Sequence, residues 1–279
     1  MVGELHGIEA SGRAPSEHLM ILEAGSSERH YWRDLWTYRE LFAILAWRDL
    51  AVRYKQTAIG VAWAVIRPLL TVAIFTVVFG RVAKLHSDGA APYALMVFAG
   101  MLPWTLFSTI LNDASNSLVT NANLIGKVYF PRLIVPSATI VVALVDAGIT
   151  LLLLLGLMGI YRFAPDWRIL FLPAFVALAV LASLGPALLM TAMNVKYRDF
   201  RYIIPFVLQF GIYASPVGFS SATVPKQWRL LFSLNPVVGV IDGFRWCLLR
   251  GQAPLYMPGF FASLGVIAVM LWVGVSYFR

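Results

Sequence analysis

Long apolar runs separated by short polar segments fill the chain from residue 59 to its end. Each run is about 20 residues or longer, the length that a helix needs to cross ~30 Å of hydrocarbon. The runs are continuous, whereas strands of a membrane barrel alternate apolar and polar positions. The pattern predicts an all-α integral membrane protein with six transmembrane helices, at roughly residues 59–79, 92–111, 133–161, 169–193, 202–219 and 257–278.

A more polar helix is predicted before the first span, in "YRELFAILAWRDLAVRYKQT" (38–57). At about 100° per residue it has one apolar face with Trp47 and Tyr54 and a second with Leu45 and Val52, separated by charged stripes. Such an amphipathic helix lies in the headgroup layer. The alternative is a soluble helix of a small N-terminal domain, which the short preceding chain disfavours because it cannot build a core.

The segment between the last two spans contains "WRLLFSLNPVVGVIDGFRWCLLRG" (228–251). Its two apolar stretches are too short to cross a bilayer and are broken by Asn235, Pro236 and Gly239. Interrupted backbone at membrane depth is tolerated where protein or a cavity covers it. We therefore expect two re-entrant helices here. The chain then divides into a mobile cytoplasmic arm (1–30), an amphipathic interface helix (31–57) and a six-span transmembrane domain (58–279).

Composition agrees with a membrane protein, since 59% of the residues are hydrophobic and only 13% are charged, against about 25% charged in soluble chains. The net charge of +8 is spread over several loops rather than one patch. It therefore reflects the positive-inside rule and not nucleic-acid binding. An even number of spans and the basic residues before the first span predict that both termini are cytoplasmic.

No catalytic set is evident in the sequence. The four histidines lie in polar segments, the single Cys247 matches no metal spacing, and no G-x-x-x-x-G-K-[ST] phosphate loop is present. We therefore expect a chain that is not an enzyme and binds no cofactor itself. Arg67 and Asp146 lie inside predicted spans, where charge is costly. Two interpretations remain open, namely that they pair with each other or that they line a pathway.

Aromatic residues make up 14% of the chain. Most aromatics in membrane proteins are interfacial anchors, but those deeper in the spans have faces suited to stack on sugars. The candidate pathway aromatics are Trp63, Phe75, Phe98, Trp104 and Phe107. Composition alone does not separate a glycan path from ordinary packing.

Several motifs, in order along the chain, closely resemble a known family. They are "RYKQTAIGVAWAVIRPLL" (53–70), "FAGMLPWTLFS" (98–108), "SNSLVTNANLIGKVYFPRLIVP" (115–136), "NVKYRDFRYIIPFVLQF" (194–210), "ASPVGFS" (214–220) and "NPVVGVIDGFRWCLL" (235–249). The resemblance is to the permease subunit of bacterial polysaccharide ABC exporters of the ABC-2 type, which export O-antigen, group 2 capsule or teichoic acid. It extends from about residue 31 to the end.

The resemblance implies a permease homodimer with two copies of a separate cytoplasmic ATPase that binds the ATP and Mg²⁺. It implies that the loops after the second and fourth spans dock in the ATPase as coupling helices. The residues assigned to this contact are Asn121, Lys127, Tyr129, Arg132, Lys196, Tyr197, Arg198, Asp199 and Arg201. It also implies an outer gate that includes Pro225, Trp228, Asn235, Pro236, Asp242 and Arg245. The alternative for "KYRDFR" is a plain positive-inside loop, which needs no aromatics between its charges.

We therefore expect the membrane half of an ATP-driven exporter in the bacterial inner membrane. It would move a polysaccharide linked to an undecaprenyl-type lipid, with membrane lipid and the lipid-linked glycan as partners. Two alternatives remain, an ABC-2 exporter of small lipids or drugs and a multi-span glycosyltransferase. The second should carry paired acids or a basic cluster facing a lipid diphosphate, and neither is clear in the sequence.

Overall fold

The computed structural model describes residues 35–55, 60–84, 89, 91–253 and 255–278. The expected arm (1–30) and the ends of the expected interface helix lie outside these ranges. Every regular element within them is helical. The helices are α2 (Arg39–Lys55), α3 (Gly60–Phe75), the π-helix η2 (Thr76–Val82), α4 (Tyr93–Thr120), α5 (Ala122–Ile125), α6 (Ile134–Ile160), η3 (Trp167–Phe171), α7 (Leu172–Lys196), α8 (Phe200–Gly211), η4 (Ser221–Thr223), α9 (Lys226–Phe232), α10 (Pro236–Leu248) and α11 (Met257–Phe278).

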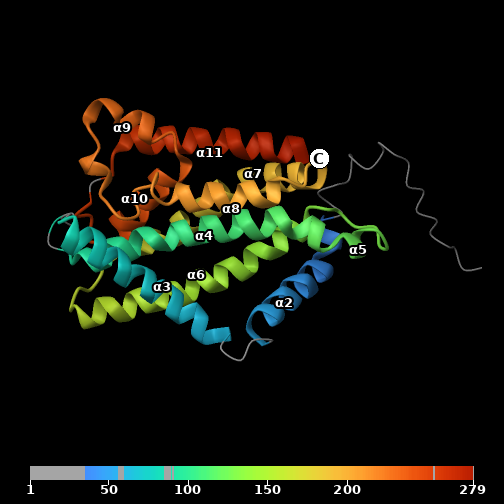
Figure 1. The fold of residues 1–279 in the computed structure, drawn as a ribbon, viewed down its shortest axis with the longest axis horizontal. Coiled ribbons are helices and arrows are strands. Elements are labelled where there is room, and N and C mark those ends of the chain that lie inside the picture. The colour runs from blue at the N-terminus through green and yellow to red at the C-terminus, as the bar shows by residue number, and fades with distance from the viewer. Residues whose placement is uncertain (1–34, 56–59, 85–88, 90, 254, 279) are drawn as a thin grey trace, which may run out of the picture.

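Five of the helical segments described are long and apolar enough to cross a membrane. They correspond to the first, second, third, fourth and sixth predicted spans: Ala62–Val82, Tyr93–Thr120, Ile134–Ile160, Trp167–Lys196 and Met257–Phe278. They lie side by side in an elongated bundle, with α5 at one end and α9 and α10 at the other (Figure 1). The predicted all-α membrane fold is confirmed.

The predicted span at 202–219 differs from the expectation. Its helix, α8, has 12 residues, which is about 18 Å at ~1.5 Å per residue and shorter than the hydrocarbon core. The chain continues as turns through residue 219. Pro216 prevents a continuous helix through residue 219, because it has no N–H for a helical hydrogen bond and disfavours helix at the preceding residue. A count of six complete spans stays a prediction.

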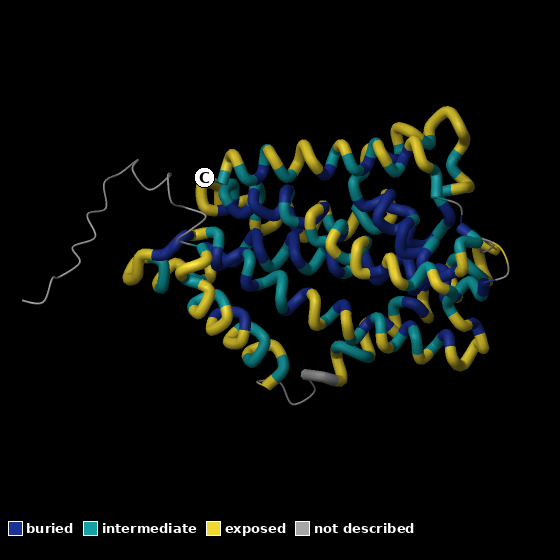
Figure 2. The backbone as a smooth tube through the Cα atoms, turned by 180° about the vertical axis from the view of Figure 1, so that it is seen from behind, coloured by how far each residue is buried: buried dark blue, intermediate teal, exposed yellow. Residues whose placement is uncertain are grey.

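Helix α4 is the central element of the bundle. In its most apolar stretch 78% of the residues are buried, against 17% to 28% in the other four membrane-length segments. The buried positions in Figure 2 concentrate along this helix and its neighbours. Side chains such as Leu95, Phe98 and Ile110 are fully buried. α4 also continues to Thr120, nine residues past the predicted end of its span.

The predicted interface helix is present as α2 and packs across the α5 end of the bundle (Figure 1). Leu45 and Ala46 are buried and form a second core with Phe130 and Ile134. Trp47, in contrast, is 65% exposed. The helix therefore packs one face on protein and leaves an aromatic side chain outward, which is the amphipathic arrangement expected of a helix at a membrane surface.

Helices α7 and α11 cross at two glycines. A Cβ on Gly274 would lie 2.1 Å from the backbone oxygen of Gly185, and a Cβ on Gly185 would lie 2.6 Å from the backbone of Met270 and Leu271. Small residues allow this close approach of membrane helices. The crossing depends on glycine at both positions.

Gly274→Ala is expected to destabilise the protein by about 1–3 kcal/mol, because the methyl group forces α7 and α11 apart. The measurement is the apparent melting temperature of the purified chain in detergent. Gly265→Ala, on the same helix, is the matched control, since a Cβ there meets nothing within 4 Å. An equal melting temperature for the two variants would contradict the tight crossing.

Candidate functional site

The first predicted coupling segment, residues 121–132, joins α4 to α6 at one end of the bundle. It contains the single turn α5, followed by irregular chain. Asn121 is half-buried. The other assigned side chains of this segment are exposed, and they are Lys127, Tyr129 and Arg132.

This segment is fixed to α2 at two points. Phe130 is 5% exposed and packs in the core that α2 helps to form. The Nη2 of Arg48 on α2 donates a hydrogen bond of 2.8 Å to Oδ1 of Asn121. Because Phe130 anchors the segment in the core, a displacement of its exposed part can be transmitted to the helices that it joins.

The second predicted coupling segment, 196–201, is the short connection between α7 and α8. α7 ends at Lys196 and α8 begins at Phe200. The Lys196 ammonium lies 5.1 Å from the Tyr197 ring centre, and the Tyr197 ring lies 6.4 Å from that of Phe200. The assigned side chains are all exposed, namely Lys196, Tyr197, Arg198, Asp199 and Arg201.

Buried polar contacts join the bases of the two coupling segments. The Asn194 amide donates to the carbonyl oxygen of Ser115 at 2.9 Å and to Oδ1 of Asn116 at 3.1 Å. One turn earlier, the Thr191 hydroxyl shares its single proton between the carbonyl oxygen of Ala114, at 3.0 Å, and that of Ala187 in its own helix, at 2.6 Å. These bonds tie α7 to α4, so the two connections share one support. Polar residues at the ends of the apolar runs were the only feature of the sequence that pointed to this link.

A cavity of about 540 Å³ opens between α3, α4, α6 and the last turn of α2. Its wall combines two tryptophans with charged and hydroxyl side chains. The lining includes Arg53, Tyr54, Trp63, Arg67, Thr71, Trp104, Thr105, Ser108, Thr109, Asp146 and Thr150. The volume falls in the range of small-ligand sites.

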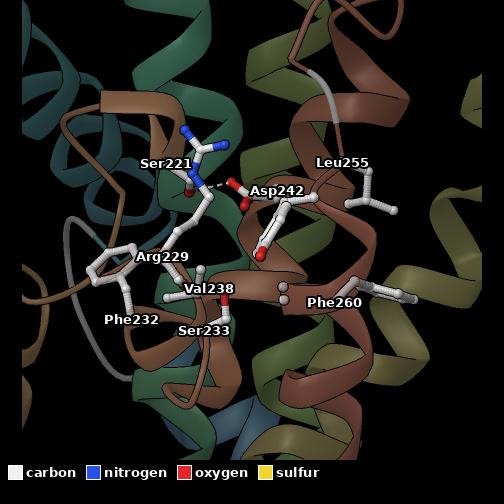
Figure 3. A pocket seen from close by; sticks show the side chains of 11 residues that line it. Ser221, Arg229, Phe232, Ser233, Val238, Asp242, Leu255 and Phe260 are labelled. Atoms are coloured by element: carbon white, nitrogen blue, oxygen red, sulfur yellow. Dashed lines mark hydrogen bonds between the residues drawn. The ribbon is translucent and has the colours of Figure 1, made fainter. Parts of the chain in front are cut away.

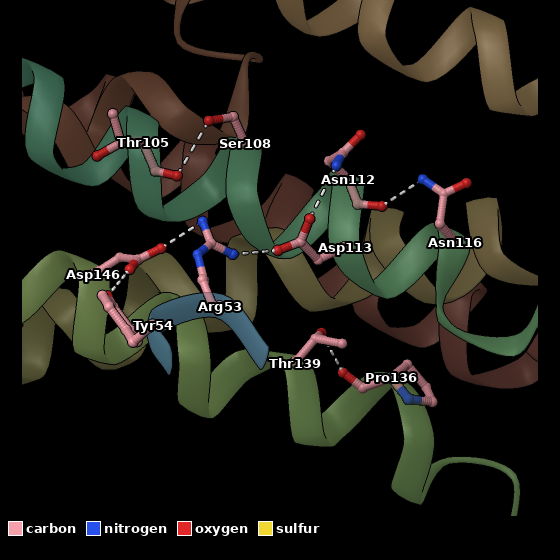
Figure 4. Close-up of polar contacts among 10 residues, drawn as sticks. All are labelled: Arg53, Tyr54, Thr105, Ser108, Asn112, Asp113, Asn116, Pro136, Thr139 and Asp146. Atoms are coloured by element: carbon pink, nitrogen blue, oxygen red, sulfur yellow. Dashed lines mark hydrogen bonds and ion pairs between the residues drawn. The ribbon is translucent and has the colours of Figure 1, made fainter. Parts of the chain in front are cut away.

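Arg53 joins α2 to two membrane helices at the edge of this cavity (Figure 4). Its Nη1 lies 3.0 Å from Oδ2 of Asp113 on α4, and its Nη2 lies 2.6 Å from Oδ2 of Asp146 on α6. The Tyr54 hydroxyl donates to the other oxygen of Asp146, and the Asn112 amide donates to Asp113 at 2.9 Å. We call Arg53, Tyr54, Asp113 and Asp146 the clasp.

The clasp decides against one of the two interpretations that the sequence left open for Asp146, its pairing with Arg67. Asp146 binds Arg53 and Tyr54 rather than Arg67. Arg53 also binds a second carboxylate, that of Asp113, which lies two residues beyond the predicted end of the second span. The only feature of the sequence that pointed to this contact was the position of Asp113, a charged residue just after a predicted span.

The Tyr54 hydroxyl is held in its protonated form by this environment. Burial raises its pKa above the ordinary value, and the hydrogen bond to the Asp146 carboxylate raises the pKa further. Tyr54 is therefore a donor to Asp146 throughout the physiological range of pH.

The candidate pathway aromatics separate into two groups. Trp63 and Trp104 line the cavity, and Trp63 is 53% exposed. Phe75, Phe98 and Phe107 are buried in the core around α4 and do not line the cavity. An apolar run does not reveal which of its faces points to neighbouring helices. The pathway role of all five stays a prediction.

The predicted outer-gate segment forms two short helices before α11, at the end of the bundle opposite α5 (Figure 1). Pro225 precedes α9, on which Trp228 is 55% exposed. Asn235 caps α10 by accepting a 3.1 Å hydrogen bond from the backbone N–H of Val237, and Pro236 occupies the first helical position. This is the typical start of a helix.

Two charged residues of α10 point inward. Asp242 accepts a 2.7 Å hydrogen bond from the Ser221 hydroxyl, at a small pocket of about 10 Å³ (Figure 3). Arg245 is 0% exposed and donates to the carbonyl oxygens of Met96, Val217 and Phe219. Arg245 thus fixes α10 to α4 and to the turns after α8. That these helices open and close stays a prediction.

Groups of three or more His, Cys, Asp or Glu that could hold a metal ion do not occur among the residues described.

Comparison with known proteins gives a consistent result. Residues 40–249 match the ABC-2 type transporter family. The O-antigen export system permease protein RfbA of Myxococcus xanthus is 27% identical over 249 residues, covering 88% of this chain and 94% of RfbA. The polysialic acid transport protein KpsM of Escherichia coli is 24% identical, covering 83% of this chain and 90% of KpsM.

A third similar protein is the inner membrane transport permease YadH of Escherichia coli K12, which is 25% identical over 73% of this chain and 81% of its own length. The family match covers three quarters of the chain and includes the two connecting segments, the cavity and the outer helix pair. The chain is a membrane subunit of the ABC-2 type transporter family.

Proposed function

We propose that this chain is the permease of an ATP-driven exporter that moves a polysaccharide linked to an undecaprenyl-type lipid across the bacterial inner membrane. The observation that carries the proposal is the similarity to RfbA and KpsM over more than four fifths of the chain. RfbA is named for O-antigen export, and KpsM is named for polysialic acid transport. The sequence has no phosphate loop. In this proposal a separate ATPase subunit has that loop and binds the ATP and Mg²⁺.

In this proposal the exporter holds two copies of the chain and two of the ATPase. A cavity of about 540 Å³ suits a small ligand and is too small to enclose a polymer. A polymer needs a continuous channel, and a second copy of the chain would complete one. Both chain termini would be cytoplasmic. The α5 end of the bundle, with its exposed coupling segments and basic residues, then faces the ATPase.

Energy would enter through those two segments. They are short, exposed and supported by one set of buried hydrogen bonds between α4 and α7. Closure of an ATPase dimer would push both at once and move the spans as rigid bodies. Movement at the outer end would then open the helix pair α9–α10.

The test is deletion of the gene in its own bacterium. We expect surface polysaccharide to disappear and lipid-linked polysaccharide to accumulate in the inner membrane, with recovery when the wild-type chain is supplied. Unchanged surface polysaccharide would overturn the proposal and favour a small lipid or drug as cargo. Loss of all lipid-linked polysaccharide, inside as well as outside, would point to an enzyme of synthesis instead.

A further inference from the structure

One face of α3 lines the cavity at helical spacing. Trp63, Arg67 and Thr71 are separated by four residues each, so their side chains follow one stripe. Arg67 lies five residues inside the apolar segment that begins at Ala62. That distance is about 8 Å along a helix, a depth comparable with the boundary between headgroups and acyl chains. Arg67 therefore presents its charge to the cavity near the N-terminal end of its span.

Arg67 differs from the other arginine at the cavity. Arg53 is bound by the carboxylates of Asp113 and Asp146. The Arg67 guanidinium has neither a hydrogen bond nor an ion pair with any residue in the described part of the chain. A guanidinium carries five N–H donors in a planar fork that matches phosphate oxygens. A cation in a span is costly unless it is paired, so such residues mark ligand paths.

Four hydroxyl groups of the wall can accept hydrogen bonds from a ligand, and the one lining carboxylate in the described part of the chain, Asp146, is already bound by Arg53 and Tyr54. The hydroxyls of Thr71, Thr105, Ser108 and Thr150 donate to carbonyl oxygens of their own helices. Their oxygens can therefore accept hydrogen bonds but do not supply donors to an anion. Arg67 is the cation of this wall that no carboxylate of the described residues binds, whereas the four hydroxyl oxygens suit the O–H groups of a sugar.

We propose that this cavity binds the phosphate-bearing headgroup of a polyprenyl lipid carrier, with Arg67 as the residue that binds the phosphate. The inference rests on the proposed function, since it names the part of the cargo that this cavity receives. Trp63 and Trp104, which flank the same space, would contact the first sugar attached to the phosphate. The size of the cavity matches a headgroup with one attached residue rather than a longer chain.

The test measures binding of farnesyl diphosphate, a short polyprenyl diphosphate, to the full chain in phosphatidylcholine nanodiscs with any subunits that co-purify. Arg67→Gln is expected to weaken binding at least tenfold, and Arg67→Lys is expected to recover part of it. Arg81→Gln is the matched control, an exposed arginine in the π-helix that continues α3. It should bind as the wild type does.

Competitors identify the ligand. Farnesol, which lacks phosphate, should not compete, and inorganic pyrophosphate should compete only at much higher concentration. Equal competition by farnesol would overturn the phosphate site, and equal competition by pyrophosphate would overturn the lipid assignment. Wild-type binding by Arg67→Gln would also overturn the proposal. Melting temperatures of the variants exclude misfolding as the cause of lost binding.

The inference and the proposed function can fail separately. If the deletion test shows polysaccharide export and Arg67→Gln cells export at the wild-type rate, the headgroup site is wrong and the exporter stands. If the deletion leaves surface polysaccharide unchanged, the exporter of polysaccharide is wrong whatever the probe does.

Discussion

Asp199→Arg is expected to abolish export and to remove the ATPase from the purified complex. Asp199 is the one acid among Lys196, Arg198 and Arg201 in the exposed connection between α7 and α8. Reversing its charge leaves only positive charge on a segment that, in the proposed function, fits the surface of the ATPase in one register. Like charges brought together at an interface cost several kcal/mol, and truncating one member of a buried charge pair costs about 2–5 kcal/mol.

The measurement is the amount of ATPase that co-purifies with a tagged chain, together with surface polysaccharide in the same cells. Asp199→Asn separates lost attraction from new repulsion and should give an intermediate result. Glu40→Arg is the matched control, with the same charge change on an exposed position of α2 at the same end of the bundle. Normal co-purification and export by Asp199→Arg would show that this connection does not contact the ATPase.

Arg53→Gln is expected to have the second largest effect, because it leaves two carboxylates without their shared cation. The side chains of Arg53, Asp113 and Asp146 are 37%, 29% and 23% exposed, so solvent screens part of the loss. Hydrogen bonds to charged groups contribute about 1.5–3 kcal/mol. We expect a loss of about 2 kcal/mol and a fall of roughly 5 °C in the apparent melting temperature.

Arg39→Gln is the control, at the other end of the same helix, where the guanidinium lies 5.7 Å from the Trp36 ring. The double variant Arg53→Gln/Asp146→Asn should be less destabilised than the sum of its single variants, since removing both partners leaves fewer unpaired charges. Additive effects would mean that the ion pair between Arg53 and Asp146 does not contribute to the stability of the protein. Export should also fall in Arg53→Gln if α2 must move together with α4 and α6.

The apolar pattern predicted most of the spans well, for a physical reason. A segment that faces lipid must be apolar throughout, so α6 and α11 end within about a residue of their predicted limits. The end of α4 was missed because residues 112–120 are polar. They continue the helix since Arg53 and Asn194 bind them, and contacts with distant segments are not visible in local hydropathy.

The site was predicted less completely than the fold. The exposure of the charged residues in the coupling segments could be predicted from the sequence, because a short charged loop cannot be buried in hydrocarbon. The partner of Asp146 did not follow, since it depends on how α2 crosses the bundle. The difference between Trp63, which lines the cavity, and Phe98, which is fully buried, likewise depends on which face of each helix meets a neighbour.

The fully buried Arg245 has a consequence for the order in which the protein assembles. Its guanidinium is satisfied by carbonyl oxygens of α4 and of residues 217 and 219, and an unsatisfied cation in the interior is too costly to persist. During biogenesis α10 therefore docks only after α4 and the chain following α8 are in place. In newly inserted chains the outer helix pair α9–α10 should therefore be the last part to become resistant to quality-control proteases.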